Sequence, residues 1–101
     1  MAVLLSQDLP LRREDLSAVT AALGAQENPP EGLLLHALTE LPGGGVRVVD
    51  VWESPDLYEK FLTERLLPTM GKVFAERGIP LDGPMPEPEL AEVHDLITAR
   101  R

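Results

Sequence analysis

The chain has 101 residues, 44% hydrophobic and 26% charged, which fits one folded domain and favours neither disorder nor a coiled coil for the whole chain. Nine basic against seventeen acidic residues give a formal charge of -8 at pH 7, and with no basic stripe to offset it we expect no nucleic-acid partner. The absence of cysteine excludes disulfides, a thiol nucleophile and thiolate-bound metals.

The start of the chain, MAVLLSQDLPLRR, shows no targeting signal. It lacks the basic first part of a signal peptide, and its apolar run is far shorter than the about 20 residues of a membrane span. We therefore expect a cytoplasmic protein that makes no membrane contact.

Residues 2–8, AVLLSQD, form a short apolar run that ends near Pro10 and predicts a first strand. From Arg12 to Leu23 apolar residues recur at helical spacing, and Gly24 stands where a left-handed residue ends a helix. The segment AQENPPEG that follows contains two consecutive prolines, so it predicts a loop.

Two apolar runs, Gly32 to Leu41 and Val46 to Glu53, predict a hairpin around the sequence PGGG. The sequence does not decide which residues of the two strands lie opposite each other. A loop of Pro42 to Gly45 turns His36 away from the face of Trp52, whereas a loop that begins one residue later places His36 directly opposite Trp52.

A second helix begins after Ser54, an N-cap residue that is followed by Pro55 at the first helical position. Its apolar stripe predicts one buried face, composed of Leu57, Tyr58, Phe61, Leu62 and Leu66. Pro68 predicts a break or kink near Leu67, after which one or two further turns end at Gly78.

The segment IPLDGPMPEPE predicts an extended loop or lid, and Leu90 to Thr98 predicts the last strand. The order β-α-β-β-α-β over residues 1–101 then indicates a single ferredoxin-like α+β domain. Right-handed crossovers place both helices on one face of a four-stranded antiparallel sheet, in strand order 4-1-3-2.

The other face of that sheet has no helix to cover it. The two hairpin strands carry apolar residues on both faces, and a bare apolar face requires a partner. A second copy of the sheet is the simplest one, so we expect a homodimer.

The segments PPEGLLLHAL, GGGVRVVDVWES and YEKFLTERLLP, with EVH in the last strand, together resemble the dimeric α+β barrel superfamily. The similarity is greatest to small actinomycete proteins related to the antibiotic-biosynthesis monooxygenases. It covers nearly the whole chain. The resemblance implies a dimeric barrel that acts on an aromatic or polyketide-like small molecule, without a cofactor.

By the same resemblance, Trp52, Tyr58 and Phe61 would line the substrate cavity between sheet and helices. The asparagine that the quinone-forming members place four residues before the tryptophan falls on Val48, which has no polar group. The haem-degrading members use a histidine of the second helix, and residues 54–78 contain none. We therefore expect no haem and no other cofactor.

Three polar residues are candidates for catalysis: His36, His94 and Asp50. His36 lies among leucines and is either a base in a half-dry pocket or a core histidine. His94 would serve as the base if the protein resembles the polyketide cyclases of this fold, and is otherwise a solvated residue or a dimer contact. Asp50 either orients a histidine or accepts a structural hydrogen bond.

Other site types are not indicated. Two histidines with scattered acids lack the spacing of a zinc site, and the three glycines at 43–45 lack the lysine of a phosphate loop. The sequence thus predicts a cofactor-independent monooxygenase, with two alternatives: a cyclase that uses histidine, or a dimer that binds ligands without catalysis.

Overall fold

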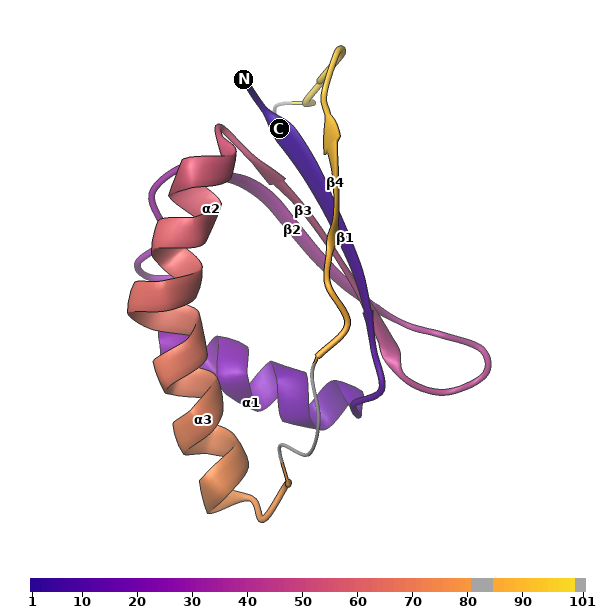
Figure 1. Ribbon diagram of the computed structural model, residues 1–101, viewed down its shortest axis with the longest axis vertical. Helices are drawn as coiled ribbons and strands as arrows, with labels where there is room; N and C mark the ends of the chain where they lie inside the picture. Colours follow the sequence, from indigo (N-terminus) through magenta and orange to yellow (C-terminus); the bar gives the residue numbers. More distant parts are fainter. Residues whose placement is uncertain (81–84, 100–101) are drawn as a thin grey trace.

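The computed structural model of the protein describes residues 1–80 and 85–99 (Figure 1). Its sheet consists of β1 (Val3–Leu9), β2 (Leu33–Glu40), β3 (Val46–Trp52) and β4 (Glu89–Glu92). All neighbouring pairs are antiparallel, in the order β2-β3-β1-β4. This is the predicted order, and the α+β fold is confirmed.

The helices α1 (Arg13–Leu23), α2 (Pro55–Phe61) and α3 (Leu67–Glu76) lie on one side of the sheet (Figure 1). Gly24 ends α1 at φ 65°, and the Ser54 hydroxyl accepts a hydrogen bond from the Leu57 amide at the start of α2. The predicted end of the first helix at Gly24 and the predicted N-cap at Ser54 are therefore both present. None of the helices in the described residues is long and apolar enough to cross a membrane.

Of the predicted break or kink near Leu67, the break does not occur, because helical structure continues through Pro68. A π-helical turn, η1 (Leu62–Leu66), joins α2 to α3, and the Leu67 amide donates to the Leu62 carbonyl five residues back. Pro68 then lies in the first turn of α3, where its missing N–H is tolerated. The wider turn accommodates the proline without ending the helix.

The last strand is shorter than the predicted Leu90 to Thr98. Glu92 pairs with Val3 at the start of β1, and Val93 donates its amide to the Ala2 carbonyl at 2.9 Å. Because β4 runs antiparallel to β1, the chain beyond Val93 has almost no β1 left to pair with. Of the predicted loop over residues 79–89, residues 81–84 lie outside the described part.

Both hairpin registers considered from the sequence are wrong. Glu40 pairs with Val46, so five residues form the loop, which is closed by the Leu41 amide donating to the Gly45 carbonyl at 3.0 Å. This register places His36 opposite Asp50. The pairing then shifts by one residue at Leu34, and Leu33 lies opposite Trp52.

Strand alternation gives the sheet two distinct faces. The inner face packs on the helices and supplies most of the buried core, which comprises Val3, Leu5, Leu9, Val46, Val48 and Trp52 from the sheet with Leu16, Val19, Tyr58, Val73 and Phe74 from the helices. The outer face carries, by the pairing register, the apolar residues Leu4, Leu35, Ala37, Val49 and Val51. Leu35 is 44% and Leu4 37% exposed, so the described residues leave much of this face uncovered.

Candidate functional site

A cavity of about 290 Å³ lies between the inner face of the sheet and the helices. Its walls are mostly apolar and include Leu5, Leu9, Leu16, Leu23, Leu33, Val48, Leu62, Leu66, Leu67 and Met70. The polar groups that reach it are few, and most of them come from the sheet. An apolar cavity with a few converging polar groups is typical of a small-molecule site.

Asp50 is the most buried polar residue of the cavity wall, with 8% of its surface exposed. Its Oδ1 lies 2.7 Å from His36 Nδ1, and its Oδ2 accepts a hydrogen bond from Trp52 Nε1 at 3.2 Å. Asp50 and Trp52 are two residues apart on β3, so both face the helices. Each carboxylate oxygen therefore has a donor, which offsets the cost of burial.

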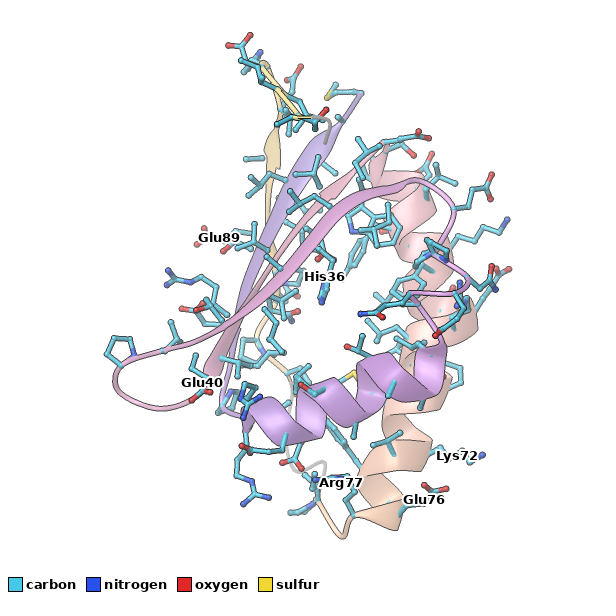
Figure 2. All side chains as sticks on the ribbon, turned by 180° about the vertical axis from the view of Figure 1, so that it is seen from behind. His36, Glu40, Lys72, Glu76, Arg77 and Glu89 are labelled. Carbon is cyan, nitrogen blue, oxygen red and sulfur yellow. The ribbon has the colours of Figure 1, made fainter. Side chains whose placement is uncertain are left out.

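The cross-strand pairing brings His36 to the same face of the sheet as Asp50. Figure 2 shows His36 projecting from β2 toward the helices. The hydrogen bond to Asp50 raises the pKa of His36 above its ordinary value, against the opposing effect of burial. Because an ionised carboxylate only accepts, His36 Nδ1 carries the proton and Nε2 is the nitrogen available to a ligand.

Three aromatic residues form a continuous wall. The ring of Trp52 meets Tyr58 edge-on at 5.7 Å and Phe61 at 5.3 Å between ring centres. Burial raises the pKa of the Tyr58 phenol, and the nearby Asp50 charge adds to the effect. Tyr58 is thus held neutral and can donate a hydrogen bond.

The structure brings together five of the six residues that the sequence suggested: His36, Asp50, Trp52, Tyr58 and Phe61 all line the cavity. His94 does not join them. It follows β4 in an irregular, exposed segment and is absent from the cavity wall of its own chain. The role of each residue stays a prediction.

One residue of the site, Gln7, was missed in the sequence. Gln7 alternates with Leu5 and Leu9 on the inner face of β1, so strand alternation could have placed it there. Its Nε2 donates to the Pro86 carbonyl at 2.6 Å, which holds residues 85–88, called the strap below, against the cavity. Within the described ranges, no group of three His, Cys, Asp or Glu could hold a metal.

Comparison with known proteins shows similarity in structure. No family model matches the chain, and no curated protein matches it. A candidate antibiotic biosynthesis monooxygenase of Chloroflexus aurantiacus superposes with a TM-score of 0.63 at 19% identity, over 97% of this chain and 98% of that one. A second such candidate, of Caulobacter crescentus, gives 0.63 at 17% identity over 93% and 91%.

A variant of SnoaB, a cofactor-independent oxygenase of Streptomyces nogalater, also superposes on the chain. Its TM-score is 0.61 at 14% identity, over 97% of this chain and 98% of that one. The chain thus has the fold of antibiotic-biosynthesis-monooxygenase-like proteins, as the sequence resemblance implied. Identities this low establish the fold alone.

Proposed function

We propose that the protein is a cytoplasmic, cofactor-independent enzyme that deprotonates an aromatic or polyketide-like molecule and passes the resulting anion to dioxygen. The hydrogen bond of 2.7 Å between His36 and Asp50, at the wall of an apolar cavity, carries this proposal. An imidazole backed by a buried carboxylate is a general base with a fixed tautomer.

In the proposed reaction the ligand lies against Trp52 and Phe61, and His36 Nε2 takes a proton from it. Asp50 stabilises the imidazolium that forms. The carbanion or phenolate then reduces dioxygen, so that a ring methylene becomes a carbonyl. One oxygen atom enters the product, and the other leaves as water with the two substrate hydrogens.

The same base supports a second reaction. An anion formed beside a carbonyl can attack another carbonyl of the same molecule and close a ring, which consumes no dioxygen. The structure favours His36 over His94 for either reaction, because only His36 contacts Asp50 and the cavity. A protein that binds such a molecule without transforming it is the remaining alternative.

We further propose that the active form is a homodimer joined through the outer face of the sheet. The apolar residues Leu4, Leu35 and Val49 lie on that face, and the helices of residues 1–80 and 85–99 lie on the other. An ion pair at 2.7 Å, between Asp8 and Arg47, lies on the same face toward the hairpin end of β1. Such an apolar centre beside polar groups is typical of an interface.

The test is an oxygen-electrode screen of polycyclic phenols whose keto tautomer carries a ring methylene, with the purified protein, followed by mass analysis of products. Oxygen uptake with a product gaining one oxygen supports oxygenation; conversion without uptake supports ring closure. We expect His36→Gln to lower the rate by about 10²- to 10⁴-fold. His94→Gln decides between the two candidate bases, and a loss of equal size in that variant would contradict the assignment to His36.

A further inference from the structure

The charged side chains that line the cavity are of one sign. Asp50 lies in the wall and Glu87 in the strap, and no lysine or arginine of the described part lines the cavity. His36 can add a positive charge only when it is protonated. With His36 neutral, a ligand in the cavity therefore faces two carboxylates and, among the described residues of the wall, no cation.

One arginine, Arg65, lies against the aromatic wall, and its guanidinium is engaged in other hydrogen bonds. The Arg65 guanidinium donates to the backbone carbonyls of Leu23 at 3.0 Å and Asn28 at 3.2 Å. Its carbon lies 5.6 Å from the centre of the Phe61 ring. Arg65 thus links the end of α1 to η1, and its guanidinium does not line the cavity.

The proton transfer proposed above produces one anion and one cation together. The new imidazolium pairs with the substrate anion, and Asp50 stabilises the imidazolium from its other side. A carboxylate already present on the substrate would be a second anion. Entry into the apolar cavity would remove the water that hydrates this carboxylate, and no cationic side chain of the described wall would neutralise its charge.

We propose that the enzyme accepts only substrates without a permanent negative charge: neutral aromatic or polyketide-like molecules whose carboxyl group is absent or esterified. This inference rests on the proposed function for its site and adds the substrate class. It also restricts the kind of reaction that can supply the substrate. Where the precursor carries a carboxyl group, the step that supplies the substrate must remove it by decarboxylation or mask it as an ester.

The test measures binding by calorimetry, with naphthoate and its methyl ester as probes that differ in charge at the same ring system. At a pH above the His36 pKa we expect the ester to bind about tenfold or more tightly than naphthoate. Binding requires no turnover. The substrate class can therefore be judged even if no dioxygen is consumed, and the proposed function can fail separately.

A pair of matched variants identifies the source of the discrimination. Glu87→Gln removes the strap carboxylate and should strengthen naphthoate binding about two- to threefold, since this side chain is exposed and screened by solvent. Glu76→Gln is the control. Glu76 is an exposed residue at the end of α3 that does not line the cavity, and Figure 2 shows it far from His36.

Three results would overturn the proposal. Equal affinity for naphthoate and its ester would show that the cavity tolerates an anion. Equal effects of Glu87→Gln and Glu76→Gln would show that the strap carboxylate does not act on the ligand. No binding of the ester at all would show that the cavity does not take a neutral aromatic molecule.

Discussion

Asp50 controls the charge of His36, and this makes the pH dependence of the protein a test of the site. The hydrogen bond to Asp50 raises the pKa of His36 above its ordinary value of 6.5. A raised folded pKa means that the protonated histidine stabilises the fold at low pH. This contribution is complete below pH about 6.5 and is lost as the pH rises through the folded pKa.

A base must be neutral to act, so activity should change in the opposite direction. We expect the rate to rise with pH through the raised pKa of His36. In Asp50→Asn the negative charge is gone, so the rise should move to lower pH and the maximal rate should fall roughly tenfold or more. A pH–rate profile checks both, and an unmoved profile in Asp50→Asn would show that another group is the base.

At the scale of single residues, the sequence predicts part of the site. Asp50 and Trp52 are two positions apart in a strand, so a shared face follows from alternation alone. Whether His36 shares it depends on the number of loop residues, and three glycines allow several loop lengths. The closure at Leu41 and Gly45 decides the register, and only the three-dimensional structure shows it.

At the scale of the elements, Gly32 controls how the loop before β2 meets α2. Its φ is 87°, and an added Cβ would lie 2.5 Å from Leu57 Cδ1 and 2.9 Å from Leu57 Cβ. The Gly32 carbonyl also accepts from the Glu53 amide at 2.8 Å. The position thus has little room for a side chain and a backbone conformation that favours glycine.

We expect Gly32→Ala to lower the free energy of unfolding by about 1–3 kcal/mol, through strain and the clash with Leu57. Urea denaturation followed by circular dichroism measures it. Gly43→Ala is the matched control, because no atom lies within 4 Å of its added Cβ and its φ is not positive. Equal losses in the two variants would contradict the role given to Gly32.

The element order was predictable because each boundary has a local signal, such as Ser54 before Pro55 or Gly24 after Leu23. The errors in the last strand and at Pro68 each depend on structure outside the residues concerned. The last strand ends where β1 begins, so its length depends on residues about 90 positions earlier in the chain. Pro68 is tolerated because the turn before it widens, which its local propensity does not reveal.

At the scale of the molecule, the outer face of the sheet predicts the assembly. Val49 lies near the centre of that face, between Ser6 of β1 and Ala37 of β2. Burial of a glutamate there would leave a charge unpaired in an apolar interface, which is strongly unfavourable.

We therefore expect Val49→Glu to sediment as a monomer at concentrations where the unmodified protein sediments as a dimer. Ala75→Glu, on an exposed position of α3 on the helical side, should remain dimeric. A Val49→Glu variant that stays dimeric would place the interface elsewhere. A monomeric unmodified protein would contradict the proposed assembly.

Trp52 has one more consequence, which is spectroscopic. It is the only tryptophan of the chain, it is fully buried in the cavity wall, and its indole N–H is bonded to Asp50. All tryptophan fluorescence of the protein therefore originates beside the proposed base. The unlabelled protein carries an intrinsic optical probe, whose emission responds both to a ligand on the aromatic wall and to the charge of the His36–Asp50 pair.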